Sequence, residues 1–174
     1  LPLQLGLPAL DVFLRKILAR LGARCARAMR PSDMTHPSVY GQPALRAEIA
    51  AYLQVSRGIH CAASQVFVTS GYRHSIELIG LALLKAGDRV WLEDPGYPPT
   101  RELLAHMQIA SVPVPVDADG MVVAEGVRTA PRARMAVVTP AHQSPLGVSL
   151  SLQRRLALLD WAGRNNAWIV EDDY

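Results

Sequence analysis

Four short clusters of polar residues carry the side chains of this sequence that could do chemistry. Each cluster directly follows an apolar segment with the composition of a buried strand. If those strands run parallel in one sheet, all four clusters lie at its carboxyl edge, where open α/β proteins bind their ligands. We therefore predict one composite binding site. The clusters are SGYRHS (70–75), EDPGYPP (93–99), TPAHQSPLG (139–147) and EDDY (171–174).

The first two clusters offer a turn for an anion and a ring for a heterocycle. Gly71 lets a backbone come close to a ligand, and the free N–H groups of a helix that follows it suit a phosphate, with Arg73 adding positive charge. Tyr97 lies between Pro95 and Pro98 on a rigid loop, from which its ring could cover a flat heterocycle. An ordinary strand-to-helix turn and an ordinary surface turn are the alternatives.

The third and fourth clusters offer hydrogen bonds and negative charge. His142 and Gln143 lie in a Pro-rich loop and could bond a ring hydroxyl or a carboxylate. The acids at positions 171–173 follow an apolar strand, where such charges are costly unless a positive group pairs with them. A protonated pyridine nitrogen is one such partner. A hard metal cation is the alternative, although the sequence has no second acid cluster.

Two kinds of periodicity predict the elements that position these clusters. Helical spacing of apolar residues predicts a helix over 10–29 and a second one from Pro43, with a loop between them. From residue 64 short apolar strands alternate with helices, which predicts an α/β domain with a mostly parallel sheet and helices on both faces. We expect strands at 66–69, 89–92, 109–113, 135–139 and 168–170, helices at 75–84, 100–107, 124–129 and 152–164, and a turn at 117–120.

Composition and charge exclude several classes of protein. The 174 residues suffice for one domain, and no apolar run approaches the roughly 20 residues that span a bilayer. The first residues lack the charge order and cleavage site of a signal peptide, and Cys25 and Cys61 form no metal-binding spacing, so we expect a cytoplasmic protein. Residues 1–30 carry a net charge of +5, which we interpret as the solvent face of an amphipathic helix rather than as a nucleic-acid contact.

A chain of motifs resembles the class I/II aminotransferase fold. The motifs are Y-G-x-x-x-L-R from Tyr40, T-S-G, G-D-x-V-x-x-E-x-P-G-Y ending at Tyr97, P-x-H-Q-x-P-x-G and E-D-D-Y. The His142-Gln143 pair and the R-G-I-H-C stretch from Arg57 are similar, more narrowly, to the aminotransferase-like effector domain of MocR-type regulators in the GntR family. The resemblance covers nearly the whole chain.

This resemblance implies the large domain of the pyridoxal-phosphate (PLP) transferase fold type I, here truncated. It implies one partial domain over residues 1–174, with an N-terminal helical segment at 1–63 and the start of the PLP-binding α/β domain at 64–174. PLP is the implied cofactor. The implied site residues are Gly71, Tyr72 and Arg73 for the phosphate, Tyr97 for stacking on the ring, His142, Gln143 and Tyr174 for the 3-hydroxyl, Asp172 for the pyridine nitrogen, and Gly41 for the substrate or effector.

Two departures from the family pattern limit what this chain is expected to do. Tyr72 and Arg73 stand where Thr and Gln are usual, which leaves open whether the turn receives a phosphate or the domain senses something other than PLP. Neither Lys16 nor Lys85 matches the motif of the family's Schiff-base lysine. We therefore expect no catalytic residue, no transaminase activity, and weak or no PLP binding in this chain.

The resemblance implies two alternative roles for the intact protein. In the first, the domain senses PLP or a PLP–amino acid adduct for a bacterial transcriptional regulator that reads DNA through a winged helix outside this chain. In the second, it is the large-domain fragment of a genuine class I/II aminotransferase that acts on an amino acid. Both imply a homodimer without a membrane partner.

Overall fold

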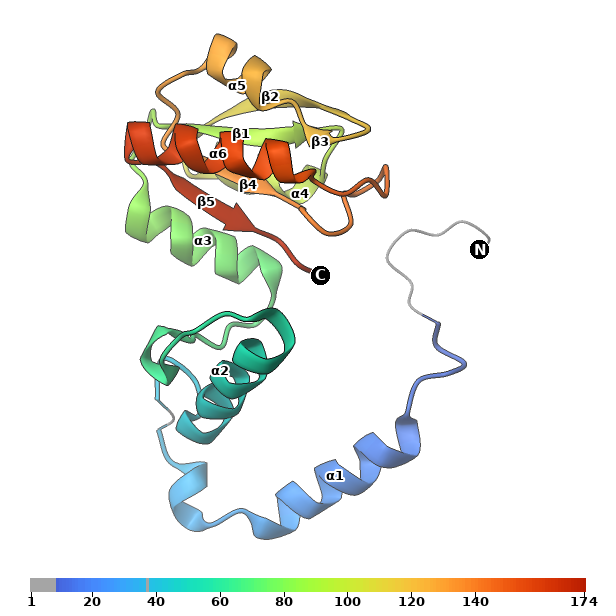
Figure 1. The fold of residues 1–174 in the computed structure, drawn as a ribbon. Helices are drawn as coiled ribbons and strands as arrows, with labels where there is room; N and C mark the ends of the chain where they lie inside the picture. Colours follow the sequence, from blue (N-terminus) through green and yellow to red (C-terminus); the bar gives the residue numbers. More distant parts are fainter. Residues whose placement is uncertain (1–8, 37) are drawn as a thin grey trace. The chain divides into compact units, whose positions relative to one another are not determined.

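The computed structural model describes residues 9–36 and 38–174 (Figure 1). The chain forms two compact units. The first unit ends at Val68, and the second comprises Thr69–Tyr174. The expected division of one partial domain at residues 63 and 64 stays a prediction. No helix among the described residues is both long and apolar enough to cross a membrane.

In the part of the first unit that the structure describes, there are two α-helices and two short 3-10 helices. α1 spans Arg15–Ala28 and begins five residues later than the periodicity predicts. Its apolar residues are all exposed within the described chain. α2 spans Pro43–Arg57, starts at the predicted proline and ends at Gly58, whose φ of 65° is the left-handed conformation that stops a helix.

The strand predicted at residues 66–69 is absent, and this prediction was wrong. The backbone there bonds to a loop and to a side chain instead of to a neighbouring strand: the Val68 N–H donates to the Tyr40 carbonyl at 3.0 Å, and Arg46 Nε donates to the Val66 carbonyl at 2.8 Å. The apolar run therefore packs inside the first unit, where the Tyr40 and Phe67 rings meet edge to face at 5.4 Å.

The second unit is built around a five-stranded sheet in the order β3-β2-β1-β4-β5. All neighbouring strands are parallel except β3, which is antiparallel to β2. β3 has only two residues after a tight turn, so periodicity gave no sign of it. The mostly parallel sheet is confirmed. The bounds are β1 Arg89–Asp94, β2 Ala110–Asp117, β3 Gly120–Met121, β4 Met135–Val138 and β5 Trp168–Glu171.

Helices cover both faces of this sheet, as the sequence predicts (Figure 1). α3 (Tyr72–Leu83) and α4 (Pro98–His106) enclose one apolar cluster, and α5 (Val123–Thr129) and α6 (Leu152–Asn165) enclose the other. In the second cluster the rings of Trp91 and Trp161 stack with centroids 3.8 Å apart. Gly126 lies against Trp91 so closely that an added Cβ would be 2.8 Å from its ring. Two filled cores therefore fix the sheet between its helices.

The register of β1, β4 and β5 brings their polar ends to one edge of the sheet. Leu92 pairs with Val137, and Val138 pairs with Glu171, so the residues that follow these strands lie beside one another. The Asp172 N–H continues the ladder and donates to the Val138 carbonyl at 2.9 Å. Glu93, Thr139 and Asp172 thereby lie at the same carboxyl edge, where parallel α/β sheets bind ligands.

Candidate functional site

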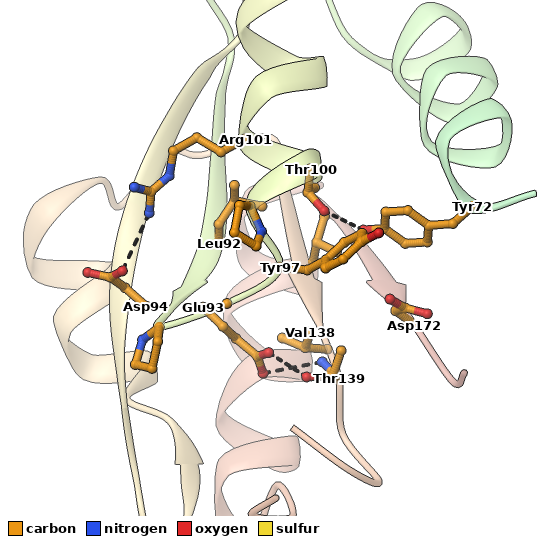
Figure 2. A pocket seen from close by; sticks show the side chains of 14 residues that line it. Tyr72, Leu92, Glu93, Asp94, Tyr97, Thr100, Arg101, Val138, Thr139 and Asp172 are labelled. Atoms are coloured by element: carbon orange, nitrogen blue, oxygen red, sulfur yellow. Dashed lines mark hydrogen bonds and ion pairs between the residues drawn. The ribbon is translucent and has the colours of Figure 1, made fainter. Parts of the chain in front are cut away.

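A pocket of about 210 Å³ opens at this carboxyl edge, within the second unit (Figure 2). The ends of β1, β4 and β5 form its base, and the first turns of α3 and α4 form its rim. All four polar clusters contribute to it: Tyr72 comes from the first, Tyr97 from the second, Thr139 from the third and Asp172 from the fourth. His142 and Gln143, which belong to the third cluster, are not among the residues that line it.

A buried carboxylate, Glu93, joins the strand ends beneath the pocket (Figure 2). One of its oxygens accepts the Thr139 N–H at 3.2 Å, and the other accepts the Thr139 hydroxyl and the Gln143 amide. Such donors offset the cost of burying a charge. Glu93 and Thr139 begin the second and third polar clusters but were not predicted as site residues, although an acid that follows the apolar run V-W-L is a signal of this kind.

Gln143 is buried, and its side chain is fully engaged inside the protein. Its Nε2 donates to the carbonyls of Pro95 and Ser144, both at 2.8 Å, as well as to Glu93, and its Oε1 accepts the Leu146 N–H at 3.1 Å. The amide therefore joins the loop after β4 to the loop after β1. Its neighbour His142 is exposed. Gln143 thus contacts two residues of the pocket lining, Glu93 and Pro95, from behind the pocket, and His142 contributes nothing to the lining.

Asp172 is half-buried at the pocket wall among other negative charges. Burial raises the pKa of its carboxyl above the ordinary range, and the nearby charges of Asp173 and Glu93 raise it further. A carboxylate in this environment gains from a positive partner. Tyr174, two residues later, is 77% exposed and is absent from the pocket lining.

Two tyrosines from different helices meet across the pocket (Figure 2). The rings of Tyr72 and Tyr97 lie edge to face with centroids 5.5 Å apart. The Tyr72 hydroxyl also forms a 2.6 Å hydrogen bond with Oγ1 of Thr100, a buried residue in the first turn of α4 that sequence reasoning did not single out. Tyr97 stays half-exposed, so part of its ring is available to a ligand.

The turn before α3 has the form that suits an anion. Gly71 has a φ of 128°, a conformation that favours glycine, and no protein atom lies within 4 Å of where its Cβ would be. No side chain caps the helix that begins after it. Arg73 is exposed, and its nearest acidic partner is Glu102, at 4.0 Å between Nη1 and Oε2.

The remaining predicted residues lie elsewhere in the chain. Gly41 belongs to the first unit, where its φ of 98° and its close approach to Val68 account for the glycine. Lys85 follows the end of α3 opposite to Tyr72, and this 12-residue helix is roughly 18 Å long at 1.5 Å per residue. Lys16 lies on α1 in the first unit.

The acids of the fourth cluster do not gather into a metal site. Among the described residues, no group of three or more His, Cys, Asp or Glu side chains is placed to hold a metal ion. On the pocket rim, Asp94 is instead paired with Arg101, with 3.5 Å between Oδ1 and Nη2.

Comparison with curated proteins gives relatives among transcriptional regulators. A probable rhizopine catabolism regulatory protein, MocR, of Rhizobium meliloti is 38% identical over 97% of this chain. An HTH-type pyridoxine biosynthesis transcriptional regulator, PdxR, of Corynebacterium glutamicum is 38% identical over 80% of it. The chain spans about a third of the length of these relatives, 34% and 30%.

Solved structures with the same fold are aminotransferases. A kynurenine aminotransferase of Pyrococcus horikoshii, in complex with PMP, superposes with a TM-score of 0.85 at 26% identity over 97% of this chain and 43% of its own. LysN, an alpha-aminoadipate aminotransferase of Thermus thermophilus complexed with N-(5'-phosphopyridoxyl)-L-leucine, superposes with a TM-score of 0.80 at 27% identity over 97% and 42%.

The family assignment rests on nearly the full length of the chain. The model of the family described as aminotransferase class I and II matches residues 14–174, which include both units and every residue of the pocket. The fold expected from the sequence, an α/β domain of the PLP-dependent transferase type, is confirmed by the solved structures, of whose chains this one covers 43% and 42%. The chain therefore belongs to the aminotransferase class I and II family.

Proposed function

We propose that this chain is part of the aminotransferase-like effector domain of a MocR-type transcriptional regulator, where its pocket helps to bind PLP or a PLP–amino acid adduct. Identity supports the regulator over the enzyme. The regulators of Rhizobium and Corynebacterium are each 38% identical to this chain, whereas an aromatic-amino-acid aminotransferase of Thermococcus litoralis and a 2-aminoadipate transaminase of Thermus thermophilus are 25% and 27% identical.

Asp172 is the observation that carries the PLP part of the proposal. Its carboxyl has a raised pKa because it is partly desolvated next to Asp173 and Glu93, and a protonated ring nitrogen would relieve this unfavourable environment. Tyr97 offers a half-exposed ring in the same pocket, as stacking on a flat heterocycle requires. The residues present thus fit the ring end of the cofactor.

The turn at Gly71 supports the same ligand at its phosphate end. The first N–H groups of a helix have no partner within the helix, and the positive end of the helix dipole favours an anion there. Arg73 adds a positive side chain beside this turn. The bound cofactor would supply an electron-withdrawing ring, while the residues of this chain bind and orient it.

The position of Lys85 supports binding without a covalent bond. This lysine of the second unit lies at the end of α3 that faces away from the pocket turn. Covalent attachment and proton transfer both need a lysine next to the cofactor. We therefore expect this chain by itself to bind the cofactor weakly and to have no transaminase activity.

The role of the whole protein follows from a difference in affinity between two states. A bound effector changes DNA binding only if it favours one arrangement of effector and DNA-binding domains over the other. In this proposal the protein is a cytoplasmic homodimer that contacts DNA through a winged-helix domain separate from these residues, and the effector is the small molecule that shifts its state.

Calorimetric titration with pyridoxamine 5'-phosphate tests the proposed site, because this ligand cannot react with surface lysines. We expect measurable binding to the chain and a roughly 10- to 100-fold loss in Asp172→Asn, the range that a charged hydrogen bond corresponds to. Asp160→Asn is the matched control, since it removes only an exposed pair with Arg164 on α6. Equal affinity in all three proteins would contradict the proposal.

A further inference from the structure

Tyr72 ties the beginnings of two helices together across the pocket. It is the first residue of α3, and its hydroxyl bonds at 2.6 Å to Thr100 near the start of α4. Its ring meets that of Tyr97, the residue that caps α4, with an angle of 79° between the planes. One side chain therefore makes both a polar and an aromatic contact to the opposite rim (Figure 2).

Each of these contacts holds Tyr72 in its place. Thr100 is 4% exposed, so its hydroxyl loses a buried hydrogen bond if Tyr72 swings away. Edge-to-face contacts such as the one between Tyr72 and Tyr97 add to the area that the two rings bury. Burial raises the pKa of the Tyr72 phenol, and the phenol therefore stays neutral and able to donate at physiological pH.

With Tyr72 in this position the pocket is small for a flat ligand with a charged substituent. Its volume of about 210 Å³ lies below the roughly 300–1,000 Å³ of small-molecule sites. A ring that enters between Tyr72 and Tyr97 must displace the Tyr72 ring from its contact. The nearby carboxylates of Asp172 and Glu93 do not oppose this movement, because the phenol carries no charge.

We propose that Tyr72 is a latch on this pocket: its hydrogen bond to Thr100 closes the site, and breaking that bond admits the ligand and limits which ligands enter. This inference rests on the proposed function, since it concerns the same ligand. It adds a specificity-determining residue to the site. The free energy that holds the latch closed is subtracted from the affinity of every ligand that must open it.

Three variants separate the parts of the latch. Thr100→Val removes the partner of the hydroxyl and keeps the shape, Tyr72→Phe removes the hydroxyl and keeps the ring, and Tyr72→Ala removes the whole side chain. Tyr52→Phe is the control, because Tyr52 is an exposed tyrosine of the first unit. Calorimetry measures the affinity of each full-length chain for pyridoxamine 5'-phosphate, and circular dichroism checks that each is folded.

A second measurement follows the latch without any ligand. The sequence has five tyrosines, so labelling with 3-fluorotyrosine gives five fluorine resonances, and Tyr72→Phe identifies that of Tyr72. We expect Thr100→Val to shift this resonance and that of Tyr97, whose ring contacts Tyr72, and to leave the other three nearly unchanged. We also expect the ligand to shift it in the unmodified chain, because binding opens the latch.

The expected result is a gain in affinity of about two- to tenfold in Thr100→Val and Tyr72→Phe, the range that one net hydrogen bond corresponds to, and a larger gain in Tyr72→Ala. Unchanged or weaker binding in all three variants, with measurable binding to the unmodified chain, would overturn the latch and leave the proposed function intact. No binding to any of the proteins, Tyr72→Ala included, would overturn both.

Discussion

Glu93 lies near the end of β1 and Asp172 directly follows β5, on either side of β4. The surroundings of these two acids differ sharply. Glu93 ends β1 beneath the pocket, is 7% exposed and accepts hydrogen bonds from both Thr139 donors and from Gln143. Asp172 follows β5 at the pocket wall, and the charges that act on its pKa are negative. One carboxylate is thus stabilised by the protein itself, and the other gains its positive partner from outside.

This difference assigns the two acids different roles at the same edge of the sheet: Glu93 stabilises the fold, and Asp172 binds the ligand. A buried carboxylate with its donors in place holds the strand ends and their loops together, so its removal should affect stability first. A half-buried carboxylate whose neighbours are also negative destabilises the folded chain slightly, and a cationic ligand gains from it. Four predictions test this division, from the largest expected effect to the smallest.

Replacing Glu93 should destabilise the chain most. Glu93→Leu leaves the Thr139 N–H, the Thr139 hydroxyl and one Gln143 proton without their acceptor in a buried place, and we expect the free energy of unfolding to fall by about 3 kcal/mol. Urea denaturation followed by circular dichroism measures this. Glu77→Leu, at an exposed position of α3, should change it by less than about 0.5 kcal/mol. Similar losses in both variants would remove the distinction.

The adjacent residues His142 and Gln143 should respond very differently to substitution. Gln143→Leu removes the bonds that join the loops after β1 and β4, so we expect a loss of about 2 kcal/mol in the free energy of unfolding. His142→Ala should cost less than about 0.5 kcal/mol, because this side chain is exposed. Thermal unfolding of the two variants measures both losses. A larger loss in His142→Ala than in Gln143→Leu would show that the buried amide does not stabilise the two loops.

Asp172→Asn should change stability in the opposite direction to Glu93→Leu. Because the folded-state pKa of Asp172 is raised, its contribution to stability is greatest below the unfolded value of about 3.9 and is lost as the pH rises through the folded value. At pH 7 the variant should therefore be more stable, by less than about 1 kcal/mol given solvent screening, with the difference shrinking at lower pH. Urea titrations at pH 7, 5 and 3.5 measure this, and a variant less stable at pH 7 would contradict it.

The smallest expected effect concerns which neighbour acts on Asp172. Both Asp173→Asn and Glu93→Gln should lower the pKa of the Asp172 carboxyl toward its ordinary range, and Asp173→Asn should lower it more, because Asp173 is the stronger of the two charges acting on it. Carbon-13 NMR titration of the side-chain carboxyl measures both shifts. If Glu93→Gln has the larger effect, Glu93 contributes to ligand binding as well as to stability.

Local sequence patterns predicted most of the second unit and less of the first. In the second unit each predicted strand and helix alternates as found, and the adjacent strands β1 and β4 are buried on both faces and read as apolar runs. The apolar run at 66–69 has the same composition, yet its backbone bonds to Tyr40 and Arg46. The composition of an apolar run indicates a strand, but it cannot specify whether the backbone of that run bonds to a neighbouring strand or to another group.

The sequence predicted the site residues whose location follows from the order of the strands. It did not predict those whose role depends on which side chains they contact. The order of strands sends Tyr72, Tyr97 and Asp172 to one edge, and the pocket brings these three together. The amide of Gln143 could equally have faced a ligand or the protein, and only the three-dimensional arrangement gives it protein partners. The bond between Tyr72 and Thr100 spans 28 residues and has no local signal.

The contact between Gly126 and Trp91 constrains the order in which this sequence can change. A side chain at position 126 would overlap the Trp91 ring, which is itself held by a bond from its Nε1 to the Ala130 carbonyl at 3.0 Å. A larger residue at 126 is therefore tolerated only after the ring at 91 has become smaller, whereas the reverse order passes through an overpacked intermediate. Substitutions at the two positions are therefore tolerated in one order only, starting from the present pair. With small residues at both 91 and 126 a cavity is left, and either position can then accept a larger residue first.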